Sequence, residues 1–279
     1  MSFNRQKIYS DKPKLKIVPT RTKRRKIKKT SNTKIKRINT PSIRKIRKKI
    51  PKVKKAQIKR KNCDRKIFKP LSRWTNSLKG QPIFILGNSP SIEKQSLELL
   101  DPYFTLGINR IFYLYQPTVL FWQDRQMWRR NKDEILTTEA IRVCRDIVDK
   151  NKLFLNYSLG LDPFKMIGKP HRLKGRGNTT AIAVQFAVSL GCSSIVLLGT
   201  DCKYNGKDKT DFYGKNPDHT DRTLDMCKEA SKWVKKSCPV PIYNCSRNKQ
   251  WPIVKLKDIL KELGPKKFGR KYFKKLFSR

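Results

Sequence analysis

The chain has 279 residues, of which 67 are Lys or Arg and 21 are Asp or Glu, so its formal net charge at pH 7 is +46. It contains no apolar stretch near the roughly 18 residues of a transmembrane helix, and its N-terminus lacks the apolar core of a signal peptide. Seven cysteines without a Cys-x-x-Cys pair, and only two histidines, argue against a disulfide framework and a zinc site. We expect a cytoplasmic protein in a reducing compartment.

Most of the charge is concentrated at the start of the chain. Residues 1–70 hold 29 Lys or Arg and two acids, Asp11 and Asp64, which gives a net charge of +27. Such a segment buries too little apolar surface to offset its ordering entropy, so we predict a disordered basic arm. Its partner is expected to be a polyanion, either DNA or RNA, with an anionic membrane surface as the second candidate.

The rest of the chain predicts one α/β domain at residues 71–264, followed by a basic, aromatic tail at 265–279. Apolar runs predict strands at about 82–87, 103–108, 118–122, 140–143, 152–155, 194–198 and 241–243. Helical spacing predicts helices at about 92–100, 125–136, 180–190, 221–236 and 256–263. Residues 157–177 are rich in Gly, Pro and Lys, and predict a loop or lid. This alternation predicts a mainly parallel sheet with helices on both faces.

The first strand runs directly into the turn Gly87-Asn88-Ser89-Pro90-Ser91. Ligands of open α/β sheets bind just beyond such strand ends. The glycine allows close backbone approach, the small polar residues supply hydrogen-bonding groups, and the amides beyond Pro90 favour an anion. Neither a dinucleotide fingerprint nor a Walker loop is present. The turn therefore predicts a nucleotide site, with an ordinary capped strand-to-helix turn as the alternative.

Other polar residues follow strands or begin helices, so they are expected at the same edge of the sheet. The candidates for binding a nucleotide or substrate are Gly87, Asn88, Ser89, Ser91, Asn109, Asp124, Asn178, Thr179, Thr180, Gly199 and Ser246. Asp201, at the end of the most apolar strand, is the candidate catalytic carboxylate, and His219, flanked by two acids, is the candidate acid or base. Turn formation, helix capping or solvation is the structural alternative for each of them. Lys165, Lys169, His171, Arg172, Lys174 and Arg176 could hold phosphates, although general surface charge explains them better.

The turn at 87–91 resembles the Gly-Asn-Gly-Pro-Ser signature of a Rossmann-like superfamily. This superfamily includes bacterial sialyltransferases of the lipooligosaccharide type, motility-associated glycosyltransferase-like proteins and MptE-like 6-hydroxymethylpterin diphosphokinases, with phage-encoded members among them. The resemblance covers about residues 80–262 and continues at Asn109-Arg110, Asp124, Gly177-Asn178-Thr179, Leu197-Leu198-Gly199-Thr200-Asp201, Phe212-Tyr213-Gly214, His219 and Asn244-Cys245-Ser246. Ser89 replaces the second glycine of the signature, and His219 matches the acceptor-region histidine of the sialyltransferases only loosely in position.

The resemblance implies a nucleotide-dependent transferase of the glycosyltransferase-like kind. It would use a nucleotide or nucleotide-sugar donor without a required metal, and His219 would deprotonate an acceptor hydroxyl. The first alternative is diphosphoryl transfer from ATP, which would need Mg²⁺ and acidic ligands such as Asp124 and Asp201. The second alternative is a non-catalytic nucleic-acid-binding protein with a degenerate nucleotide fold.

Overall fold

A computed structural model describes residues 64–160, 166, 168–175, 178–203, 209–264 and 268–279. All of these residues belong to one compact unit, Pro41–Arg279. Residues 1–63, which make up most of the predicted arm, lie outside the described residues.

The described strands form one eight-stranded sheet in the order β6-β5-β4-β3-β2-β1-β7-β8, and every pairing is parallel. The strands are β1 (Pro82–Leu86), β2 (Phe104–Ile108), β3 (Val119–Trp122), β4 (Ile141–Arg145), β5 (Leu155–Gly160), β6 (Arg172–Lys174), β7 (Ser194–Leu198) and β8 (Ile242–Asn244). The central strands β1, β2, β3 and β7 are buried along their whole length. Their apolar runs fit this position because a parallel sheet is covered on both faces.

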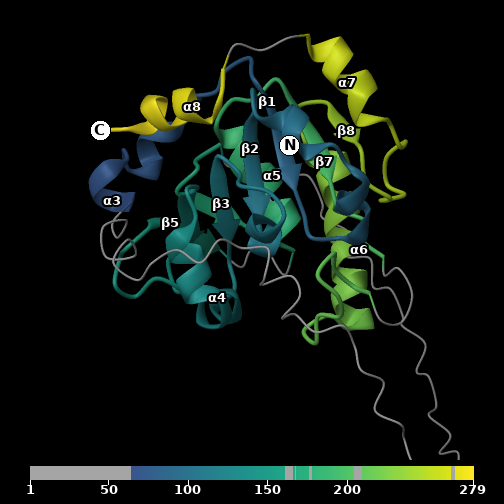
Figure 1. Ribbon diagram of the computed structural model, residues 1–279, viewed down its shortest axis with the longest axis horizontal. Helices are drawn as coiled ribbons and strands as arrows, with labels where there is room; N and C mark the ends of the chain where they lie inside the picture. Colours follow the sequence, from purple (N-terminus) through teal and green to yellow (C-terminus); the bar gives the residue numbers. More distant parts are fainter. Residues whose placement is uncertain (1–63, 161–165, 167, 176–177, 204–208, 265–267) are drawn as a thin grey trace, which may run out of the picture. The chain divides into compact units, whose positions relative to one another are not determined.

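Helices cover both faces of the sheet (Figure 1). One face packs against α5 (Thr179–Ser189), α6 (Asp221–Ser237) and α8 (Arg270–Phe277). The other packs against α4 (Arg125–Thr137), α7 (Leu256–Leu263) and the 3₁₀ turns Pro90–Lys94, Leu97–Leu100 and Asn109–Tyr113. The predicted α/β fold class is confirmed.

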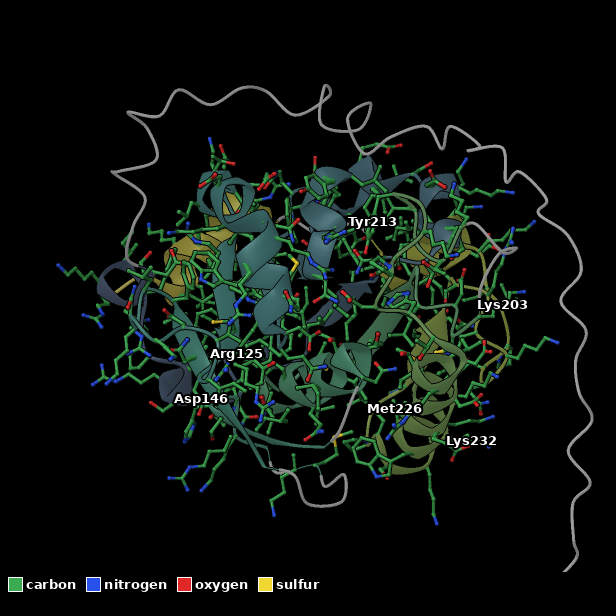
Figure 2. All side chains as sticks on the ribbon, turned by 90° about the horizontal axis from the view of Figure 1, so that it is seen from below. Arg125, Asp146, Lys203, Tyr213, Met226 and Lys232 are labelled. Carbon is green, nitrogen blue, oxygen red and sulfur yellow. The ribbon has the colours of Figure 1, made fainter. Side chains whose placement is uncertain are left out.

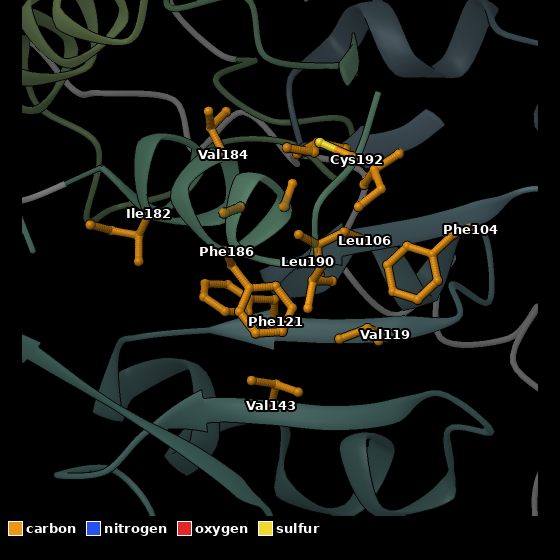
Figure 3. Packing of buried hydrophobic residues seen from close by; sticks show 14 of the residues in the cluster. Phe104, Leu106, Val119, Phe121, Val143, Ile182, Val184, Phe186, Leu190 and Cys192 are labelled. Carbon is orange, nitrogen blue, oxygen red and sulfur yellow. The ribbon is translucent and has the colours of Figure 1, made fainter. Parts of the chain in front are cut away.

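The apolar helix α5 is the central element of the first face. Phe186 of α5 packs on Phe121 of β3, with ring centroids 5.3 Å apart (Figure 3). Phe121 in turn stacks on Tyr157 of β5, with ring centroids 4.8 Å apart. A helix that is apolar on all sides belongs in the interior. Because α5 is held this firmly, its N-terminus has a fixed position at the edge of the sheet.

Two predicted elements differ from the structure. The predicted helix at 92–100 is instead two 3₁₀ turns, because Gln95 between them is extended and its Nε2 donates to the carbonyl of Cys245 at 3.0 Å. The predicted strand at 152–155 begins only at Leu155, because the carboxylate of Asp149 accepts from the amides of Leu153 and Phe154 and holds the chain in a turn. The segment 157–177, predicted as a loop, also differs, because it contains most of β5 and all of β6.

The structure also places the ends of the described chain within the fold. Asp64 in α3 (Asp64–Ile67) is buried and paired with Arg142 of β4, although the sequence assigned it to the arm. Phe277 of α8 stacks on Trp74 with ring centroids 3.7 Å apart, and Lys69 donates its amide to the carbonyl of Phe277, so α3 and α8 lie side by side (Figure 1). Residues 64–70 and 268–279 thus share the core of the domain.

Candidate active site

The strand order contains one position where the connections that leave two neighbouring strands run in opposite directions along the sheet. β1 lies between β2 and β7, and the chain leaves β1 toward β2 on one side and leaves β7 toward β8 on the other. Such a switch point opens a crevice beyond the carboxyl ends of two neighbouring parallel strands. Gly87 and Gly199 are the residues that directly follow these two strands.

The two glycines let the turns after β1 and β7 touch. A Cβ at Gly87 would lie 2.2 Å from the carbonyl oxygen of Gly199, a distance no side chain can adopt. Gly199 has a φ of +61°, in the left-handed region that glycine adopts readily. The amide of Ser89 donates to the same carbonyl of Gly199 at 2.9 Å. Close backbone contact at this point leaves the space above both strands open for a ligand.

That space is a cleft of about 510 Å³. Figure 2 labels four residues on its walls, Arg125, Lys203, Tyr213 and Met226. Ten of the residues predicted from the sequence line it: Gly87, Asn88, Ser89, Asn109, Asp124, Asn178, Thr179, Thr180, Gly199 and His219. The structure therefore gathers most of the predicted site from six different segments of the chain.

The most informative feature of the cleft is a pair of side-chain amide oxygens. Oδ1 of Asn88 and Oδ1 of Asn109 are buried and accept no hydrogen bond from any described residue. Nδ2 of Asn88 donates to the carbonyl of Ile108 at 3.0 Å, which fixes the orientation of that amide. Leaving a buried acceptor unsatisfied costs about 1–3 kcal/mol. A ligand that donates hydrogen bonds to both oxygens would remove this cost.

The N-terminus of α5 forms another wall. Oδ1 of Asn178 accepts from the amides of Thr180 (2.7 Å) and Ala181 (3.2 Å), and Nε2 of Gln123 donates to Oγ1 of Thr179 at 2.9 Å. The predicted capping role of Asn178 is therefore present, and Thr180 is half-buried on the cleft wall. The positive end of the helix dipole favours an anion at this wall.

A histidine and a carboxylate meet across from these groups. Nδ1 of His219 lies 3.5 Å from Oδ2 of Asp211, and the hydroxyl of Tyr213 donates to the same oxygen at 2.7 Å. Burial raises the pKa of Asp211 above its ordinary value, while His219 and the Tyr213 hydrogen bond act in the opposite direction. A neutral imidazole that carries its hydrogen on Nδ1, next to this carboxylate, would have Nε2 free to accept a proton.

Asp211 was not among the residues predicted from the sequence. It lies in a polar loop with no periodic pattern, and the signal that could have found it is its place directly before Phe212-Tyr213-Gly214, part of the resemblance. The amide of Phe212 donates to the carbonyl of Asn88 at 2.8 Å. This hydrogen bond holds the loop, and with it Asp211, next to the turn after β1.

The remaining charges of the cleft are of both signs. Asp124 is exposed, but desolvation by its neighbours in the cleft and repulsion from Asp218 raise its pKa above the ordinary value. Asp218 itself forms an exposed ion pair with Arg130 at 2.6 Å. The guanidinium carbon of Arg110 lies 4.9 Å from the ring centroid of Tyr213. Tyr213 therefore connects a cation to the Asp211–His219 pair.

The structure does not bring Asp201, Ser91 or Ser246 to the cleft. Asp201 is 3% exposed, and its Oδ1 accepts from Oγ of Ser91 at 2.5 Å and from the amide of Arg247 at 2.9 Å. Ser246 is 1% exposed and donates to Oδ1 of Asn244 at 2.6 Å. These residues tie together the loops after β1, β7 and β8. Their position supports no catalytic role for Asp201.

The basic residues predicted as possible phosphate ligands also lie elsewhere. Lys169, His171, Arg172 and Lys174 are absent from the lining of the cleft. Lys165 and Arg176 lie outside the described residues. The cations on the cleft wall are instead Arg110, Arg125, Arg130 and Lys203.

The described residues contain no cluster of three or more His, Cys, Asp or Glu side chains that could hold a metal ion. Among the same residues, no helix has both the length and the apolar character needed to span a membrane.

No protein-family model and no curated protein matches this sequence. Among solved structures, the chain is similar to the sialyltransferase CstII from Campylobacter jejuni in complex with cytidine-5'-monophosphate, with 16% identity and a TM-score of 0.41 over 61% of this chain and 82% of that one. It is also similar to the monofunctional alpha-2,3-sialyltransferase Cst-I from Campylobacter jejuni, with 17% identity and a TM-score of 0.36 over 59% of this chain and 75% of that one. Similarity of this size assigns no family and no activity. The predicted resemblance to a Rossmann-like superfamily of sialyltransferase-like and MptE-like proteins, with phage-encoded members, stays a prediction.

Proposed function

We propose that the protein is a transferase that moves a glycosyl group from a nucleotide-sugar donor to an acceptor hydroxyl. One observation carries this proposal: the unsatisfied oxygens of Asn88 and Asn109 line the same cleft as the His219–Asp211 pair. The cleft thus combines groups that need a hydrogen-bond-donating ligand with a group that can accept a proton.

The donor would be held at the switch point. The two amide oxygens suit the hydroxyls of a ribose or sugar, or the exocyclic amine of a base, because these groups donate hydrogen bonds. The phosphate would lie toward the start of α5, where the helix dipole opposes its negative charge, and the cleft wall adds cations such as Arg110. Both expectations follow from the chemistry of the wall residues.

The proposed reaction is a displacement at the anomeric carbon. The acceptor oxygen forms a bond to this carbon as the bond to the donor phosphate breaks, and the electron pair leaves on the phosphate oxygen. Nε2 of His219 takes the acceptor proton, and Asp211 stabilises the imidazolium that results. The helix start and the basic side chains stabilise the leaving phosphate. Each group acts from the position that it holds in the cleft.

A thermal-shift screen of the full chain tests the proposal. The ligands are CMP, CMP-sialic acid, UDP- and GDP-sugars, ATP and GTP, each with and without Mg²⁺. A ligand at 100 times its dissociation constant stabilises the fold by roughly 2.7 kcal/mol. The expected result is stabilisation by one nucleotide or nucleotide sugar without Mg²⁺, lost in the Asn88→Ala variant. Stabilisation by no ligand would contradict the proposal and favour a degenerate nucleotide fold.

The same screen addresses diphosphoryl transfer. Stabilisation by ATP only with Mg²⁺ would favour that reaction over glycosyl transfer. Asp124 and Asp201, the carboxylates predicted for it, do not meet: Asp124 lines the cleft, whereas Asp201 is buried in the loop contacts beneath it. The placement of these two residues therefore supports glycosyl transfer better.

We further propose that the basic arm tethers this domain to a polyanion, which the net charge of +27 over residues 1–70 supports. The expected partner is DNA or RNA, bound with strong salt dependence because Lys and Arg displace counterions. A deletion that tests this should end at residue 63, because Asp64 and Phe68 are buried in the domain. Binding to a DNA or RNA oligonucleotide should be lost on deletion and retained in Asn88→Ala. Retention after deletion would contradict the tether.

A further inference from the structure

Two thiols lie together in the wall of the same cleft. Cys202 follows β7, and Cys227 belongs to α6, and both line the cleft. The two thiols are close enough to influence each other's pKa, and Sγ of Cys202 is 3.6 Å from the carbonyl oxygen of Cys227. The other described cysteines, Cys144, Cys192, Cys238 and Cys245, do not line the cleft. Among the cysteines that the structure describes, Cys202 and Cys227 are thus the two that a solute in the cleft can meet.

The surroundings of Cys202 stabilise a thiolate. Oγ of Ser231 lies 3.2 Å from Sγ of Cys202, and Nδ2 of Asn248 donates to it at 3.4 Å. The hydrogen bond with Cys227, followed by that with Ser231, lowers the pKa of Cys202 despite its burial. The pKa of Cys227 is raised by the same thiol–thiol hydrogen bond and by burial. Of the two thiols, Cys202 is therefore the one whose contacts favour the thiolate form.

The backbone at Cys202 supports a special role for this thiol. Its φ of 50° is left-handed, a conformation that residues other than glycine rarely adopt. Residues held this way occur preferentially at functional sites. The turn places the sulfur of Cys202 between two elements. The loop after β8 contributes Asn248, and α6 contributes Ser231 and the carbonyl of Cys227.

We propose that Cys202 and Cys227 form a dithiol site that is converted reversibly to a disulfide by a low-molecular-weight disulfide such as oxidised glutathione. The Cys202 thiolate attacks one glutathione sulfur, forms a mixed disulfide and releases one glutathione thiolate. Cys227 then loses its proton and attacks the Cys202 sulfur, which releases the second glutathione. The two cysteines together lose two electrons and two protons, and the oxidised glutathione is reduced to two thiols.

Oxidation would change the site as well as the thiols. The side chain of Cys227 also hydrogen-bonds to Asn178, the residue that caps the start of α5. A disulfide would draw Cys227 away from this contact at the wall proposed for the donor phosphate. We expect weaker donor binding after oxidation, a consequence that rests on the proposed function.

The test uses the full chain and follows the thiols directly. Protein treated with oxidised glutathione is alkylated, digested without reductant and analysed by mass spectrometry. The expected product is a peptide pair linked through Cys202 and Cys227, which dithiothreitol separates. Cys227→Ser should instead accumulate glutathione on Cys202, because the resolving thiol is missing. Cys238→Ser, a half-buried cysteine away from the cleft, should form the Cys202–Cys227 link as the parent protein does.

Three results would overturn the proposal: no link between these two cysteines in the folded protein, equal linkage through other cysteines, or glutathione on Cys227 in place of Cys202. If a serine variant does not fold, alkylation of the parent protein decides, since Cys202 should react with iodoacetamide about 10 times faster than Cys238. None of these measurements needs a nucleotide. The dithiol site and the proposed transferase function can therefore fail independently.

Discussion

Nδ1 of His219 and Oδ2 of Asp211 lie 3.5 Å apart on a loop that the amide of Phe212 ties to the turn after β1. The hydroxyl of Tyr213 holds the same carboxylate oxygen from another direction. The imidazole thus has a fixed neighbour, and it shares a cleft with two unsatisfied amide oxygens. This geometry leads to the predictions for the site.

His219→Gln should lower kcat by about 10²–10⁴ with little change in donor affinity, because it removes the proposed base and leaves the donor wall intact. Asp211→Asn should also lower kcat. The double variant should lose little beyond the His219 change, since both residues act through one base. Steady-state kinetics with the donor identified by thermal shift measures this. His171→Gln, outside the cleft, is the control, and an unchanged kcat in His219→Gln would exclude the assigned role.

Asn109→Gly should weaken donor binding by roughly 10-fold, because one hydrogen bond of about 1 kcal/mol or more is lost. Glycine accepts the left-handed φ of 51° found at Asn109, so the free energy of unfolding should change little. Asn109→Ala should weaken binding and also reduce stability. Calorimetric titration and urea unfolding separate the two effects. Equal donor affinity in Asn109→Gly and the parent protein would rule out a ligand contact by this side chain.

Gly87→Ala should destabilise the fold by about 1–3 kcal/mol, because the added Cβ overlaps the carbonyl of Gly199. Donor binding should fall as the two turns separate. Gly269→Ala is the matched control: its Cβ would meet only the carbonyl oxygen of Asp101, at an ordinary 3.7 Å, and its effect should stay within about 0.5 kcal/mol. Urea unfolding of both variants gives the comparison, and similar losses would disprove the proposed clash.

Asp64→Ala should destabilise the domain by about 3–5 kcal/mol, because it leaves the buried guanidinium of Arg142 without its carboxylate partner. The pair is held by Nη2–Oδ1 and Nε–Oδ2 contacts of 2.8 and 2.9 Å, with side chains 4% and 3% exposed. Asp225→Ala breaks an exposed pair with Lys228 and should cost no more than about 1 kcal/mol. Denaturant unfolding of the full chain measures both. A loss for Asp64→Ala as small as the control would contradict the inclusion of residues 64–70 in the core.

Asp124→Asn should make stability less dependent on pH. The raised pKa of Asp124 means that the folded protein binds this proton more tightly than the unfolded chain, so stability is lost as pH rises from the ordinary value of 3.8 through the folded pKa. At about pH 7 the variant should be slightly more stable, because solvent screens the charge of this exposed side chain and keeps the gain small, and at about pH 3 the difference should vanish. Urea unfolding at both pH values checks this. A variant less stable at neutral pH would contradict the sign.

Much of the fold could be predicted from local patterns. The strand at 194–198 and the helix at 256–263 have the predicted bounds, because each is a strongly periodic or fully apolar segment with clear ends. The segments at 92–100 and 152–155 differ because single polar contacts, by Gln95 and Asp149, override weak apolar patterns. The pattern of neighbouring residues does not predict a contact such as that between Gln95 and Cys245, because the two residues are far apart in the sequence.

The α/β class and the candidates around the cleft could be predicted from the residues alone, because polar residues after parallel strands must share one edge of the sheet. Which of these candidates face the cleft depends on the folded loops. The left-handed turns at Gly199 and Cys202 direct Asp201 into contacts with Ser91 and Arg247, and the Phe212–Asn88 backbone bond brings Asp211 to His219. Direction of a side chain depends on a few dihedral angles and on loop contacts across the sheet, which residue spacing along the chain does not specify.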